Sequence, residues 1–128
     1  PAAAKEEQRA LAVSLRAGVT KHCGAGSATL TVDPFGDVLP CVQWRRTVGN
    51  IHKAKVHEIW TQSEDLTDVR RITTEVKSRV EAEGVDGANM NFCPGAAHTY
   101  SGNPLEFYPA ARERARIAGE ARVRLTVL

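Results

Sequence analysis

Apolar residues recur every three or four positions between Val56 and Glu83, the spacing that places them on one face of a helix. Ser63 interrupts this run, and a serine followed by acidic residues is a typical start for a new helix. The pattern therefore predicts a short helix followed by a longer one. Gly84 is expected to end the second helix, because glycine readily takes the left-handed conformation that follows many helices.

The two ends of the chain carry further helical patterns. Residues 1–20 mix apolar side chains with Lys, Glu, Gln and Arg, which predicts an amphipathic helix that leads into the rest of the domain. Residues 109–128 predict a C-terminal helix and tail. We expect this helix to begin near Pro109, because proline is tolerated at a helix start, and to run to about Ile117. The final segment, VRLTVL, is expected to form a short strand.

Between these helices the pattern changes twice. Alternating residues in ATLTV, a Pro-Gly turn in DPFGD and renewed apolar character in VLPCV predict a β-hairpin over residues 28–42. Residues 43–55 have weak periodicity and are interpreted as a loop. Residues 84–104 are rich in Gly, Asn, Ser and Pro, which predicts a long irregular loop, and such loops usually carry a ligand or a mobile tip. The expected class is α+β: a small hairpin, then helices and a long cysteine-containing loop.

Composition and charge restrict the classes of partner that we expect for this chain. The 128 residues are 42% apolar and 25% charged, as in one soluble globular domain covering residues 1–128, with a motif region at 21–108. The net charge of +2 is small and the charges are interleaved, so nucleic acid is not an expected partner. No apolar run approaches the roughly 20 residues of a membrane helix, and we expect no membrane partner and a cytoplasmic location.

Three cysteines are the main candidates for chemistry. An odd number is unsuited to a disulfide framework, and each cysteine stands beside glycine or proline rather than within an apolar run. Cys23 and Cys41 follow the spacing C-x12-G-x4-C, in which Gly36 allows the tight turn that returns Cys41 toward Cys23. Cys93 is expected to join them from the long loop, because iron–sulfur clusters draw thiolates from separate segments.

This spacing, together with TLTVDPFGDVLPC, VGNI, HEIW and FCPGAAHTYSGNP, resembles the SPASM and twitch domains. These are C-terminal auxiliary iron–sulfur domains of radical S-adenosylmethionine (SAM) enzymes, and the resemblance covers residues 20–108. It implies that Cys23, Cys41 and Cys93 bind one [4Fe–4S] cluster. It also implies a radical SAM catalytic domain or subunit as partner, a peptide as possible substrate, and SAM bound only by that separate domain. The chain lacks the C-x3-C-x2-C motif of such enzymes, so it is not expected to be catalytic alone.

The chain also departs from the family pattern. The full SPASM pattern has seven cysteines that bind two clusters, whereas the three cysteines of this chain can bind only one. The fourth ligand would come from His98, from Asp37, from a substrate or from another part of a larger protein; an imidazole can replace a thiolate on iron. Two alternatives remain open. The three cysteines and His98 would suit structural zinc in type but not in spacing, and a metal-free module would bind a peptide or protein.

Overall fold

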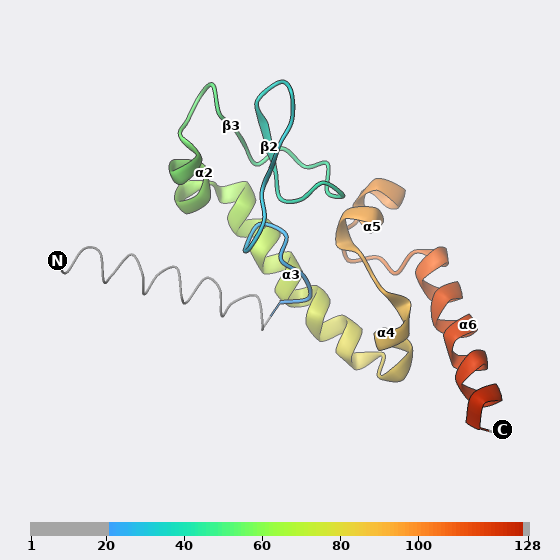
Figure 1. Ribbon diagram of the computed structural model, residues 1–128. Helices are drawn as coiled ribbons and strands as arrows, with labels where there is room; N and C mark the ends of the chain where they lie inside the picture. Colours follow the sequence, from blue (N-terminus) through green and yellow to red (C-terminus); the bar gives the residue numbers. More distant parts are fainter. Residues whose placement is uncertain (1–20, 127–128) are drawn as a thin grey trace.

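The computed structural model describes residues 21–126, in which a small antiparallel sheet is followed by five helices (Figure 1). The α+β class predicted from the sequence is therefore confirmed. The helix predicted within residues 1–20 lies outside the described residues, as do the last two residues of the predicted tail. None of the described helices combines the length and apolar character needed to cross a membrane.

The sheet contains the predicted hairpin and a third strand. Strands β1 (Thr31–Val32) and β2 (Asp37–Leu39) pair antiparallel, and β2 pairs on its other side with β3 (Gly49–Asn50). The third strand corrects the prediction of a loop over residues 43–55. Its two residues have no alternation to detect, and Gly49 fits because a Cβ there would lie 2.8 Å from the Ile59 side chain. Contact with another element, rather than local pattern, makes this segment a strand.

The hairpin turn is held by Asp33. Its carboxylate accepts hydrogen bonds from the backbone N–H groups of Phe35 at 2.8 Å and Asp37 at 3.0 Å. Gly36 has a φ of 85°, a conformation that glycine adopts without strain. The turn thus follows the sequence-based prediction. Phe35, at the tip, is 79% exposed and therefore does not contribute to the core, although an aromatic side chain would ordinarily be expected there.

The predicted pair of helices is confirmed as α2 (Val56–Gln62) and α3 (Glu64–Ala82). Ser63 separates them because its hydroxyl accepts a hydrogen bond from the Leu66 N–H at 3.2 Å and so caps α3. The same hydroxyl donates to the Val48 carbonyl at 2.6 Å, which joins the start of α3 to the segment before β3. The buried face of α3 is formed by Leu66, Val69, Ile72, Thr73 and Val76.

The long loop predicted over residues 84–104 is wrong, because this segment contains α4 (Val85–Met90) and α5 (Pro94–Ser101). Gly84, with a φ of 63°, does follow α3 in a positive-φ conformation as predicted. Both helices are short and contain Gly or Asn, so their intrinsic helix propensity is low. Burial of Met90 and Ala97, each 0% exposed, stabilises α4 and α5 instead. The local sequence does not indicate this contribution, because it depends on contacts with other elements.

Helix α6 (Pro109–Thr126) begins at the predicted proline but continues past Ile117. The strand predicted for the last residues is therefore wrong over their described part. Helix α6 packs beside α4 (Figure 1). Arg114 of α6 joins the two helices by donating a hydrogen bond to the Met90 carbonyl at 2.9 Å, and it also donates to the hydroxyl of Tyr108, the residue before α6, at 3.0 Å.

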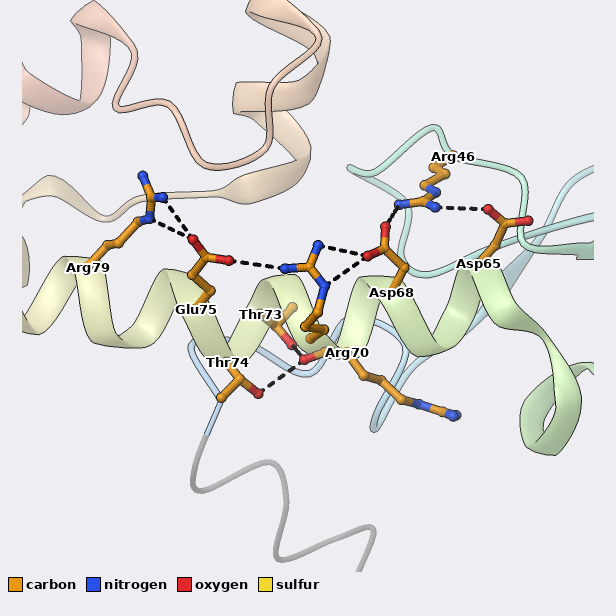
Figure 2. A network of polar contacts seen from close by, with 9 residues as sticks. Arg46, Asp65, Asp68, Arg70, Thr73, Thr74, Glu75 and Arg79 are labelled. Carbon is orange, nitrogen blue, oxygen red and sulfur yellow. Dashed lines mark hydrogen bonds and ion pairs between the residues drawn. The ribbon is translucent and has the colours of Figure 1, made fainter.

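An ion-pair ladder holds the loop after β2 against α3 (Figure 2). The Arg46 guanidinium reaches two carboxylates of α3, Asp65 at 2.8 Å and Asp68 at 2.7 Å. The ladder continues along α3 through Arg71, Glu75 and Arg79. Because Arg46 lies five residues after Cys41, the ladder limits the movement of the loop that follows this cysteine.

The buried apolar side chains form one continuous core that spans the sheet, α2–α6 and the loops between them. Trp44, at 0% exposed, is its largest fully buried member, as expected for a core residue. The side chains of Cys23 and Cys41 are partly buried against this core. The cysteine-bearing segments are therefore supported by the main packing of the molecule.

Candidate metal centre

The structure brings the three free thiols into one region. Cys23 lies before β1, Cys41 follows β2, and Cys93 lies between α4 and α5; all three are half-buried. Burial raises the pKa of the Cys23 thiol above its ordinary value, and negative charge on Cys41 and Cys93 raises this pKa further. Because Coulomb repulsion weakens with distance, this effect indicates that both of the other thiols lie near Cys23.

Two hydrogen bonds join the Cys23 segment to the Cys41 segment. The backbone N–H of Gly26 and the hydroxyl of Thr29 both donate to the Pro40 carbonyl, each at 3.1 Å. Pro40 directly precedes Cys41, and Gly26 lies three residues after Cys23. The loop after Cys23 is thus held against the end of β2.

His22 joins the Cys23 segment to the Cys93 segment. Its Nε2 atom lies 2.6 Å from the carbonyl oxygen of Phe92. Since a carbonyl can only accept, this nitrogen carries the proton and donates it. The hydrogen bond connects the residue before Cys23 with the residue before Cys93, so His22 sets the separation of these two segments.

Gly95 joins the Cys41 segment to the Cys93 segment. A Cβ at this position would lie 2.7 Å from the Gln43 carbonyl oxygen, closer than real Cβ contacts allow, and 3.0 Å from the Trp44 Cα. Only glycine therefore lets the first turn of α5 lie against the turn that follows Cys41. Each pair of cysteine-bearing segments has its own contact, so the three positions are defined independently.

Cys93 also has a structural role as the N-cap of α5. Its sulfur accepts a hydrogen bond from the Ala96 N–H at 3.4 Å, and Pro94 occupies the first turn of the helix. The Cys23 sulfur likewise accepts from the Ala25 N–H, which lowers the Cys23 pKa and opposes part of the burial effect.

Asp37 and His98 are the two candidates for a fourth ligand within this chain. Asp37 stands at the start of β2, four residues before Cys41, and its carboxylate accepts a hydrogen bond from Asn50 at 2.9 Å. His98 is half-buried in the last turn of α5. Within residues 21–126 its imidazole forms no hydrogen bond. Its role as a ligand stays a prediction.

The three cysteine thiolates suit a multi-iron cluster better than a single metal ion. Around one tetrahedral zinc, bonds of about 2.3 Å place sulfur atoms about 3.8 Å apart. Among the described residues, no three His, Cys, Asp or Glu side chains form a group that could hold one metal ion. A cluster attaches each thiolate to a different iron and so accepts wider spacing. Three soft thiolates from three separate segments match that requirement.

Sequence reasoning missed the residues that arrange this site. Gly95 and Trp44 were not expected to touch, because they come from segments far apart in the chain. His22 stands next to Cys23, and its hydrogen bond to Phe92 makes it a positioning residue for the Cys23 and Cys93 segments. The available signal was the Cys-Pro-Gly order at residues 93–95, which provides an N-cap, a first-turn proline and a close-contact glycine in succession.

Comparison with known proteins adds one finding. The family model of the SPASM domain, described as an iron–sulfur cluster-binding domain, matches residues 23–93. The match begins at Cys23 and ends at Cys93, so it contains all three thiols and the segments that connect them. Comparisons with curated proteins and with solved structures gave no match.

Proposed function

Since the chain belongs to the SPASM family of iron–sulfur cluster-binding domains, we propose that Cys23, Cys41 and Cys93 together hold one [4Fe–4S] cluster. The observation that carries this proposal is the convergence of the three thiols, each pair of segments being joined by its own contact. When bound, such a cluster supplies one-electron transfer. The chain supplies three thiolates and their N–H donors, Ala25 and Ala96.

Three thiolates leave one iron of the cluster without a ligand from these cysteines. His98 is the candidate that this chain offers, because its imidazole has no competing hydrogen bond among the described residues. It lies on α5, the helix that Cys93 caps. A substrate or a partner would otherwise occupy the fourth position.

The domain would serve a radical SAM enzyme as its auxiliary domain. The chain has no C-x3-C-x2-C motif, so in this proposal a separate catalytic domain or subunit would bind SAM and start the reaction. Helices α4 and α5, which flank Cys93, would lie on the side where a peptide substrate is held. Co-elution of the cluster-loaded chain with a radical SAM catalytic domain from the same genome tests this context. Failure of the loaded chain to associate would count against it.

The cluster itself is tested by anaerobic reconstitution of the chain beside Cys23→Ala, Cys41→Ala and Cys93→Ala variants. We expect about four irons and four sulfides per chain in the parent, with absorption near 400 nm, and a large loss in each variant. Ser78→Ala, an exposed change on α3, is the matched control and should load fully. A folded parent chain that takes up no iron would refute the proposal and leave a metal-free binding module.

His98→Ala, loaded in the same way, tests the fourth ligand. If His98 binds iron, the variant should hold less iron or show a changed electron paramagnetic resonance (EPR) spectrum after reduction. Equal iron content with an unchanged spectrum would assign the fourth position to another group.

A further inference from the structure

Trp44 presents a buried hydrogen-bond donor without an acceptor. The residue is 0% exposed, and its indole Nε1 finds no partner within the described part of the chain. Buried N–H groups in proteins almost always have a partner, since an unpaired one loses its hydrogen bond to water and gains nothing in return. An acceptor that is not part of the polypeptide would resolve this.

The backbone places the Trp44 side chain beside Cys41. The two residues form an antiparallel bridge in which the Trp44 N–H donates to the Cys41 carbonyl at 3.2 Å. Residues directly opposite each other in such a pair project their side chains to the same face, with Cβ atoms about 4.5–5.5 Å apart. The indole therefore starts next to a proposed cluster ligand.

A second contact places Trp44 near Cys93 as well. Gly95, two residues after Cys93, lies so close to the Trp44 Cα that an added Cβ would be only 3.0 Å away. Trp44 thus stands between two of the three thiol-bearing segments. The indole N–H makes no hydrogen bond to the Cys41 sulfur or to any other sulfur of residues 21–126. The cysteine sulfurs alone do not satisfy it.

We propose that the Trp44 Nε1–H donates a hydrogen bond to an inorganic sulfide of the cluster held by Cys23, Cys41 and Cys93. This inference rests on the proposed function, because it requires the cluster to be present. Sulfide ions carry negative charge, and hydrogen bonds to cluster sulfur atoms help to set the reduction potential. Donation by Trp44 stabilises the reduced cluster, which carries one more negative charge, and so raises that potential.

Trp44→Phe tests the proposal because it removes the N–H and keeps an aromatic ring. The chain contains two tryptophans, and Trp60→Phe is the matched control. Trp60 is half-buried, and Arg70 lies 4.7 Å from the centre of its ring. Both variants are reconstituted anaerobically, and their iron and sulfide contents and reduction potentials are measured. We expect full loading in both, a shift to a more negative potential in Trp44→Phe, and the parent value in Trp60→Phe.

A measurement on the unaltered chain covers the case in which Trp44→Phe fails to fold. Protein labelled with ¹⁵N at the indole nitrogens is loaded and reduced, and electron–nuclear double resonance is recorded in H₂O and D₂O. We expect coupling of the cluster spin to one indole ¹⁵N and to one exchangeable proton, both retained in Trp60→Phe.

The outcomes separate this inference from the proposed function. A parent chain that binds no iron would overturn the proposed function, and the inference with it. A fully loaded parent chain without indole coupling would overturn the inference alone. An unchanged potential in fully loaded Trp44→Phe would also overturn only the inference.

Discussion

Gly95 shows how one residue without a side chain can define a site. Its position against the Gln43 carbonyl and the Trp44 Cα depends on close contact between two backbones. The sequence identified Cys93 and the proline after it, but nothing in the local pattern revealed what α5 would touch. A glycine in that motif is compatible with a flexible turn as well as with a tight contact. Only the second interpretation matches the structure.

The first prediction concerns Gly95→Ala. Its new methyl group would collide with backbone atoms, which cannot rotate away as a side chain can. We expect the variant to lose about 1–3 kcal/mol of unfolding free energy, the usual cost of overpacking, and to bind less iron than the parent. Urea unfolding followed by circular dichroism, together with iron analysis, measures both effects.

Gly119→Ala is the matched control, because a Cβ at this helical position has no neighbour within 4 Å. Alanine is the better helix former, so the control should gain up to about 1 kcal/mol. Equal stability and iron content in Gly95→Ala and the parent would show that the two segments do not need this close contact.

Among the elements, α3 was predictable and α4 and α5 were not. Helix α3 is long, has a periodic apolar face and begins at a serine cap, so its signal lies within the segment itself. Helices α4 and α5 have six and eight residues and end at Asn91 and Gly102, both with positive φ. Helices this short are marginal in isolation, and tertiary packing stabilises them. The predicted cysteine-containing loop is therefore two helices with Cys93 between them.

The second prediction concerns the ladder between the loop after Cys41 and α3. Hydrogen bonds from Arg46 and then from Arg71 hold the pKa of Asp68 below its usual value. Asp68→Asn should lower the unfolding free energy at pH 7 by about 0.5–1 kcal/mol, as expected for a largely exposed ion pair. Urea unfolding of the parent and the variant at several pH values measures this difference.

The difference in unfolding free energy between the parent and Asp68→Asn should change with pH in a defined direction. Because the folded-state pKa of Asp68 is depressed, its stabilising contribution is complete above the unfolded-state pKa of about 3.9. The contribution is lost as the pH falls through the lower folded-state pKa, so parent and variant should converge in strong acid. Glu106→Gln, an exposed change outside the helices, should match the parent at every pH. A difference between Asp68→Asn and the parent that persists after Asp68 is protonated would contradict the proposed cause.

For the whole molecule, the proposed cluster would connect segments that are distant in the chain. Cys23, Cys41 and Cys93 each pack beside elements of the same core, and a cluster bound to all three would stabilise the folded state at the expense of the unfolded state. Loading should therefore affect global stability as well as the local loops.

The third prediction compares the loaded and stripped forms. A ligand at a hundred times its dissociation constant stabilises a protein by about 2.7 kcal/mol. For a domain of 128 residues this corresponds to an increase in Tm on the order of 10 °C. Anaerobic calorimetry before and after removal of iron by a chelator measures the shift, and Cys93→Ala treated identically should show little change. Identical Tm values for fully loaded and stripped protein would indicate that the metal does not bridge the three segments.

The sequence by itself determined the α+β class, the hairpin turn at Gly36, the α2–α3 pair with its break at Ser63, and three thiols in a family pattern. These features depend on residues that are close together in the chain, where spacing, turn residues and caps act directly. Only the tertiary structure decided the β3 pairing, the two helices around Cys93 and the contact at Gly95. It also decided the link from His22 to Phe92, which lie 70 positions apart. These features depend on side chains and backbones that meet only after the core has formed.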